Sequence, residues 1–126
     1  MPHDPETRLQ RGLACEQIAA DHFLSVGIKI LARNFRCKWG EIDLVGLDAG
    51  TLVIAEVRQR ANNNYGGALG SIDWRKQKKI IRTSQSYLQR HPQWRTLPLR
   101  FDVIALTGKS VAEYRIVWIK AAFAAT

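Results

Sequence analysis

Three carboxylates stand at positions where the surrounding sequence pattern calls for apolar side chains. Glu16 lies three residues after Leu13 and four before Ala20 in a helical apolar stripe, Asp43 lies inside the run GEIDLVG, and Glu56 follows the apolar run LVIA. An ionised carboxylate that is buried alone is energetically costly. Such a group is therefore normally paired with a cation, bound to a metal ion or directed into a cleft.

Two interpretations of these acids follow from their chemistry. Two or three carboxylates, together with water and a substrate phosphate, suit Mg²⁺, a hard cation that prefers oxygen ligands. Arg58 shares a strand face with Glu56, about 6–7 Å further along, so the two could instead form a plain ion pair on an edge strand. Arg58 could also bind phosphate oxygens through its forked guanidinium, but it cannot act as a base.

The positive charge of the chain is concentrated in one segment. The sequence has 19 Lys and Arg against 11 Asp and Glu, a net charge of +8. Residues 58–100 hold ten of those bases and a single acid, so the remainder is close to neutral. A focused positive field attracts a polyanion, usually nucleic acid; the alternative is an ordinary solvated basic surface. The predicted nucleic-acid-binding residues are Arg60, Lys76, Lys78, Lys79 and Arg82.

Other classes of protein are excluded or disfavoured by composition. No apolar stretch approaches the ~20 residues needed to span a membrane, and the polar first dozen residues predict no signal peptide. An anionic membrane surface is disfavoured as a partner because the basic helix lacks a broad apolar face. Cys15 and Cys37 have no metal-binding spacing, which is typical of reduced thiols in a cytoplasmic protein. The three histidines are likewise too scattered for zinc.

The elements that must position these residues can be read from periodicity. The pattern predicts an α/β fold in the order α-β-β-β-α-β-β-(α), in one domain over residues 1–126 with its core at about 9–119. Expected helices cover 6–26 and 71–90, with Ser71 as N-cap of the second, and a last helical turn 120–125. Expected strands cover 29–34, 41–47, 51–60, 99–106 and 113–119. Residues 61–70, with three Asn and three Gly, are expected to form a flexible loop.

Alternation within the strands predicts which side chains share a face. Ile42 and Leu44 are expected on one face, with Glu41 and Asp43 on the other. Asp102 follows Arg100 by two residues, and we interpret this pair as a structural ion pair. The four tryptophans could lie in the core or at an interface, and the core is the better expectation for at least two of them.

Taken in order, these segments resemble a known family. A first helix bearing an acid, then GEID, VIAEVRQR, a Lys-rich helix and RFDV resemble the YraN-type family of small bacterial proteins. The resemblance covers roughly residues 11–106, and WIKAAF at 118–123 fits the tail of the family. That family is similar to the archaeal Holliday-junction resolvases and to the PD-(D/E)XK nuclease superfamily.

The resemblance implies a restriction-endonuclease-like core, a central mixed sheet flanked by helices. It implies that Asp43 and Glu56 bind Mg²⁺ or Mn²⁺ and that Glu16 completes the site. Arg58 falls where the superfamily usually has its catalytic Lys, and some YraN-type relatives carry Arg there as well. Lys76 is the candidate for a Lys that has moved, with simple phosphate contact as its other interpretation. A symmetric homodimer is implied by the resolvases.

Three functions are consistent with these residues and with the resemblance. The first is a metal-dependent endonuclease for structured or branched DNA, with Glu16, Asp43, Glu56 and Arg58 as catalytic residues and Tyr65 in the loop that closes over the substrate. The second is a catalytically silent nucleic-acid-binding module with the same fold. The third is a protein-interaction module whose basic helix meets an acidic partner.

Overall fold

The computed structural model describes residues 7–60 and 72–125, and these form a five-stranded mixed sheet with one helix on each face. The elements are α1 (Arg8–Ser25), β1 (Lys29–Cys37), β2 (Gly40–Asp48), β3 (Thr51–Arg60), α2 (Trp74–Arg90), β4 (Leu99–Thr107) and β5 (Arg115–Phe123). Two short 3₁₀ turns follow α2 and β4, η3 (Pro92–Trp94) and η4 (Val111–Glu113). The predicted loop 61–70, with Tyr65, and Ser71 lie outside the described residues.

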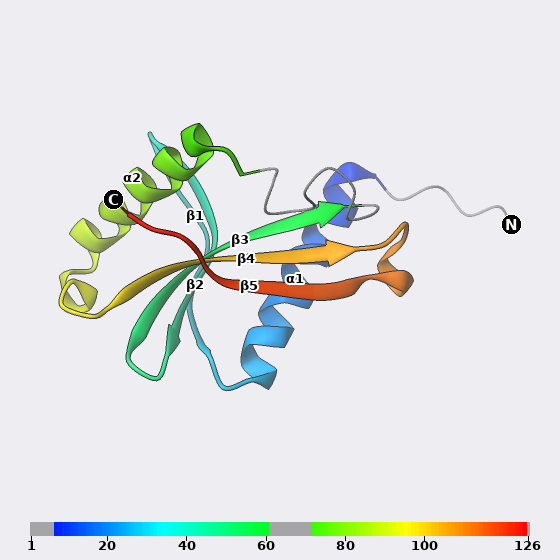
Figure 1. The fold of residues 1–126 in the computed structure, drawn as a ribbon, viewed down its shortest axis with the longest axis horizontal. Coiled ribbons are helices and arrows are strands. Elements are labelled where there is room, and N and C mark those ends of the chain that lie inside the picture. Colours follow the sequence, from blue (N-terminus) through cyan, green and yellow to red (C-terminus); the bar gives the residue numbers. More distant parts are fainter. Residues whose placement is uncertain (1–6, 61–71, 126) are drawn as a thin grey trace, which may run out of the picture.

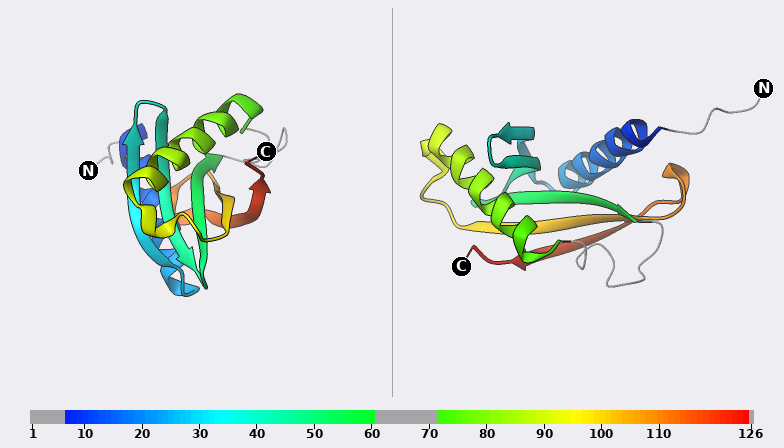
Figure 2. Two further views of the ribbon diagram at one scale, coloured as in Figure 1. Left: turned by 90° about the vertical axis from the view of Figure 1, so that its left-hand side faces the viewer. Right: turned by 90° about the horizontal axis from the view of Figure 1, so that it is seen from above.

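The strands are ordered β1-β2-β3-β4-β5 across the sheet. Only β3 and β4 run parallel, and α2 lies in the connection between them, while the other neighbours are antiparallel. The mixed sheet and the order of helices and strands are as predicted, and they agree with the restriction-endonuclease-like core that the resemblance implies. Figures 1 and 2 show the two helices lying on either side of the twisted sheet.

The expected last helical turn over 120–125 is wrong, because β5 continues through it to Phe123. The backbone N–H of Ala121 donates to Asp102, and the Phe123 ring stacks on Phe101 at a centroid distance of 5.0 Å. These contacts with β4 outweigh the helix propensity of the alanines. The start of α2 also differs, since its first residue is Trp74 and its N-cap is Asp73, whose carboxylate accepts from the backbone N–H of Lys76.

Each face of the sheet has its own apolar core. The core under α2 joins Ile80 and Tyr87 to Leu52 and Ile54 of β3, and the core under α1 joins buried α1 residues to the opposite face of the same strand. Successive residues of β3 therefore alternate between the two cores. On α1 the buried residues are Cys15, Ala19, Ala20 and Phe23, whereas Leu9, Leu13 and Leu24 of the expected stripe are exposed.

The expected shared face of Ile42 and Leu44 is wrong, because the two side chains enter different cores. Ile42 packs in the core under α2, whereas Leu44 packs under α1. Across from this point, Asn34 of β1 has a positive φ of 53°, and the pairing of β2 with β3 does not continue past Leu44 and Ala55. Asp43 therefore lies where β2 separates from β3.

The described helices are also informative about membranes. Neither α1 nor α2 is both long and apolar enough to cross a lipid bilayer.

Candidate metal centre and nucleic-acid interface

Four acids from three elements meet at the point where β2 leaves β3. Carboxylate oxygens of Glu16, Glu41 and Asp43 lie within 4.8 Å of one another. Glu56, on β3, lies close enough to Asp43 for its negative charge to raise the pKa of that carboxyl group. The structure thus brings together the three acids singled out in the sequence, from α1, β2 and β3, and their role as metal ligands stays a prediction.

The Asp43 side chain is held by a hydrogen bond from the backbone of β3. Its Oδ2 accepts the backbone N–H of Val57 at 2.8 Å, a β3 donor that has no partner on β2 at this position. Burial, and next the negative charge of Glu56, raise the pKa of Asp43 to about 7, while the Val57 hydrogen bond opposes the rise. Glu16 and Glu41 add to the increase. Burial and the neighbouring negative charges together favour a shared proton or a bound cation at this point.

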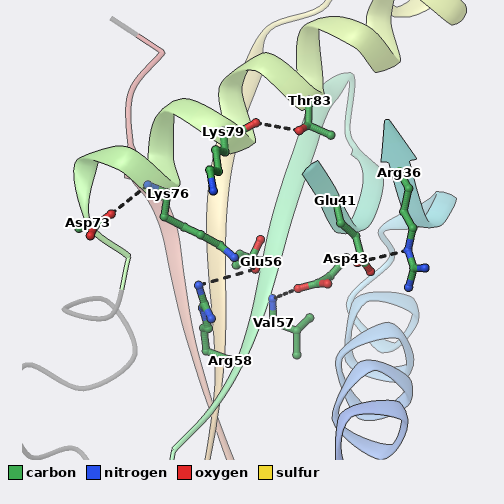
Figure 3. A network of polar contacts seen from close by, with 10 residues as sticks. All are labelled: Arg36, Glu41, Asp43, Glu56, Val57, Arg58, Asp73, Lys76, Lys79 and Thr83. Atoms are coloured by element: carbon green, nitrogen blue, oxygen red, sulfur yellow. Dashed lines mark hydrogen bonds and ion pairs between the residues drawn. The ribbon is translucent and has the colours of Figure 1, made fainter. Parts of the chain in front are cut away.

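Glu56 is covered by two cations on the side that faces α2. The residue is 7% exposed, its Oε1 lies 3.6 Å from Lys76 Nζ, and the same oxygen lies 3.9 Å from an Arg58 nitrogen. Burial raises the pKa of Glu56, and the charges of Lys76 and Arg58 oppose that rise. Figure 3 shows Lys76 reaching down from α2 to this carboxylate. The predicted Glu56–Arg58 pair is thus present, but Lys76 is the closer partner.

The other two acids are held more loosely. Glu16 accepts from the Asn34 side-chain amide at 3.1 Å, and Glu41 pairs with the exposed Arg36 at 3.3 Å. The sequence reasoning missed Glu41 as a member of the cluster, although its two-residue spacing from Asp43 on an alternating strand was a signal for it. A surface hollow of about 200 Å³ is lined by Glu16 and Asp43, so the cluster is accessible from the α1 side.

The predicted basic residues lie mainly along α2. Lys78, Lys79 and Arg82 are exposed and Lys76 is half-buried. Lys79 projects from α2 on the side where Lys76 reaches the acids (Figure 3). The half-buried Arg60 at the end of β3 donates to the carbonyl oxygen of Gln59 at 2.7 Å. Acids that converge beside a row of cations form an arrangement suited to a phosphodiester, whose oxygens need cations and whose hydrolysis commonly uses a divalent ion.

Comparison with known proteins places the chain in a family. The model of the "Uncharacterised protein family UPF0102" matches residues 15–106. The chain belongs to this family. It is 50% identical over 112 residues to a UPF0102 protein of Pseudomonas entomophila, covering 89% of this chain and 91% of that protein. It is 47% identical over 123 residues to one of Pseudomonas putida, covering 98% of each chain. The predicted YraN-type membership is thereby confirmed.

The part of the chain that matches the UPF0102 model contains the complete acid cluster. Its range, 15–106, begins just before Glu16 and includes β1 to β3, α2 and nearly all of β4. Arg8 and Arg11, which line the hollow on the α1 side, precede it. The elements that form the UPF0102 core are therefore the ones that position the acids and the basic helix.

Proposed function

We propose that this UPF0102 protein is a metal-dependent endonuclease that hydrolyses phosphodiester bonds in structured or branched DNA. The observation that carries the proposal is the convergence of carboxylates from α1, β2 and β3, three of them with oxygens within 4.8 Å of one another, beside the basic helix α2. Acids gathered from separate elements are costly to keep together without a compensating positive charge. Among the described residues this cost is partly offset by Lys76 of the basic helix, which pairs with Glu56.

The donor set fits Mg²⁺ or Mn²⁺. All four acids offer carboxylate oxygens, the ligands these hard cations prefer, and nearby described residues supply no thiolate or imidazole to the cluster. Asp43, Glu56 and Glu16 are the proposed ligands, with Glu41 as an additional one. A bound divalent ion would supply an activated water and neutralise charge on the scissile phosphate.

The cations beside Glu56 have distinct roles in this proposal. Arg58 steadies a phosphate oxygen through its guanidinium, which suits phosphate geometry and stays protonated. Lys76 takes the place of the superfamily Lys, because its Nζ lies 3.6 Å from Glu56 while its side chain is 39% exposed and so accessible to a substrate. Arg60, Lys78, Lys79 and Arg82 hold the backbone of the DNA.

A second function is favoured by a specific observation. Lys76 and Arg58 already neutralise Glu56 in the protein alone, as expected of a nucleic-acid-binding module that keeps the fold without turnover. In that case the ion pair is structural, and the basic helix still binds phosphates.

A cleavage screen tests the proposal. Plasmid, forked and four-way DNA are incubated with the purified full chain in Mg²⁺ or Mn²⁺, and nicked products are resolved on gels. We expect cleavage of at least one structured DNA and its loss in the Asp43→Asn, Glu56→Gln double variant. The matched control is Asp21→Asn, an exposed acid on the same helix as Glu16, which keeps activity. Arg58→Lys is expected to raise the cleavage rate.

The remaining outcomes separate the alternatives. Salt-sensitive binding without nicking of any DNA, and without a metal-dependent rise in melting temperature, supports the silent binding module. Binding that does not respond to salt, or no binding to nucleic acid at all, leaves the protein-interaction module.

A further inference from the structure

Two tryptophans on the surface are more exposed than their size leads one to expect. Trp74 is 60% exposed at the first turn of α2, and Trp39 is 42% exposed in the turn between β1 and β2. The other two tryptophans, Trp94 and Trp118, pack against the two cores, as expected from the sequence. A large ring left in water contributes little to folding, and such residues are typical of binding surfaces.

Trp39 and Trp74 line a single hollow although they are far apart in the sequence. The hollow has a volume of about 490 Å³, and the other lining residues among those described are all cations: Lys38, Arg75, Lys78, Lys79 and Arg82. We call this hollow the tryptophan groove. Its composition of two aromatic rings and five positive charges, with no acid in its described lining, is complementary to a polyanion that carries flat rings.

The cations of the groove are arranged around the rings. Lys38 and Arg82 each lie 4.9 Å from the centroid of Trp39. Lys78 lies 4.6 Å and Arg75 5.7 Å from the centroid of Trp74. Cation–π contacts at exposed sites are weak. The same cations can therefore turn to phosphates while a base takes their place on the ring.

We propose that the tryptophan groove binds unpaired nucleotides, with one base stacked on Trp39, another on Trp74, and the intervening phosphates on the surrounding cations. This inference rests on the proposed function for the nucleic-acid partner and names the feature of the substrate that is recognised. Base pairs of a duplex are stacked on each other and cannot cover these rings, whereas every unpaired base has a free face.

The groove and the acid cluster are connected through residues of the β1–β2 turn and of α2. Trp39 belongs also to a neighbouring surface hollow formed by the turn residues 36–41, which include Glu41 of the cluster. On the other side, α2 carries both Lys78 of the groove and Lys76, which contacts Glu56. A strand whose unpaired bases occupy the groove is thereby led toward the acids. The preferred substrate is then a DNA with a single-stranded segment next to the bond that is cut.

The test measures binding without cleavage, using the full chain in EDTA and fluorescence anisotropy. The probes are an oligothymidine of about 12 nucleotides, an abasic phosphodiester strand of the same length, and a duplex. We expect Trp39→Ala and Trp74→Ala each to weaken oligothymidine binding by about 5- to 100-fold, and to change binding of the abasic strand and the duplex by less than about twofold.

Controls separate stacking from folding. Trp39→Phe and Trp74→Phe keep an aromatic face and are expected to retain most of the affinity, and thermal melting verifies that each variant is folded. A Lys78→Ala variant is expected to weaken binding of all three probes alike, since a phosphate contact does not depend on the base.

The outcomes distinguish the groove from the proposed function. Equal affinity of the wild type for oligothymidine and for the abasic strand, or equal losses on all probes in the tryptophan variants, overturns the groove and leaves the endonuclease proposal standing. Base-dependent binding in a protein that cleaves no DNA supports the groove and overturns the endonuclease. Absence of binding to every probe overturns the groove, and the cleavage screen with forked and four-way DNA then decides the endonuclease separately.

Discussion

Two clusters of charge lie in the same sheet, one around Asp102 and one around Asp43, and they differ in how many donors surround them. Asp102 is 1% exposed and accepts hydrogen bonds from Arg100, from the Trp118 indole at 2.8 Å and from the backbone of Ala121 at 2.9 Å. Arg100 also reaches Asp48 at 2.9 Å. The predicted structural pair is thus confirmed, as part of a wider network.

The cluster around Asp43 leaves its central carboxylate with fewer donors, since among the described contacts Asp43 accepts the Val57 N–H alone. Its four acids are met by Lys76 and Arg58 beside Glu56, by Arg36 beside Glu41, and by uncharged donors. The pKa of Asp43 is consequently raised to about 7, mainly by burial and then by Glu56. A buried carboxylate with several hydrogen-bond donors stabilises the fold. A buried carboxylate beside other acids instead favours binding of a proton or a cation.

The largest effect is expected from a substitution in the cluster around Asp102, whose carboxylate is fully hydrogen-bonded. Asp102→Ala removes the acceptor shared by three donors and leaves the Arg100 guanidinium with Asp48 alone. We expect a loss of about 3–5 kcal/mol in the free energy of unfolding, measured by urea denaturation. A loss below about 1 kcal/mol would show that the hydrogen bonds of Asp102 contribute little to the stability of the fold.

The next effect is the pH dependence of stability that the cluster around Asp43 causes. The pKa of Asp43 is about 7 in the folded protein and near its ordinary value of 3.8 when the chain is unfolded. The folded state therefore binds more protons between these values, and stability falls as the pH rises from about 4 to about 7, by roughly 2–4 kcal/mol. The raised pKa of Glu56 acts in the same direction.

Urea denaturation of the wild type and of Asp43→Asn in EDTA across this range measures that effect. The variant is expected to lose much of the decline and to be the more stable of the two at about pH 8. A decline of equal size in both proteins would mean that other groups cause it.

A divalent cation bound at the acid cluster is expected to reverse the fall in the free energy of unfolding at higher pH. At about 100 times its dissociation constant, Mg²⁺ or Mn²⁺ stabilises the folded state by about 2.7 kcal/mol, or roughly 10 °C in melting temperature. The shift is larger at about pH 8 than at about pH 5.5, because carboxylates bind metal when deprotonated. Differential scanning fluorimetry measures it. Glu16→Gln and Asp43→Asn should reduce the shift, and Asp21→Asn should leave it unchanged.

The smallest effect concerns the exposed cations that adjoin the cluster around Asp43. If about five phosphates are contacted, log affinity for DNA falls with log salt with a slope near −4 to −5. Lys79→Ala is expected to reduce that slope by about 1, as measured by anisotropy titrations at several salt concentrations. Lys29→Ala, an exposed lysine at the start of β1, serves as control, and an equal change in both would assign the slope to net charge.

Much of the fold followed from periodicity. The order of helices and strands, the shared face of Glu56 and Arg58 and the ion pair of Arg100 with Asp102 were all predicted. Two failures have a common reason. The expected helical turn at 120–125 is part of β5, and Leu13 of the expected apolar stripe of α1 is exposed. In both cases the surface against which the segment packs outweighs the local sequence pattern.

The sequence by itself determined that acids stand in apolar surroundings and that the bases are concentrated in one segment, since both are properties of residue order. Only the tertiary structure decided that Glu41 joins Asp43, that Lys76 reaches Glu56 and that Trp39 faces the same hollow as Trp74. Alternation fixes the face of a side chain within one strand. Proximity between elements depends on where strands pair, and here the end of β2–β3 pairing at Leu44 and Ala55 leaves Asp43 beside β3 without a strand partner there.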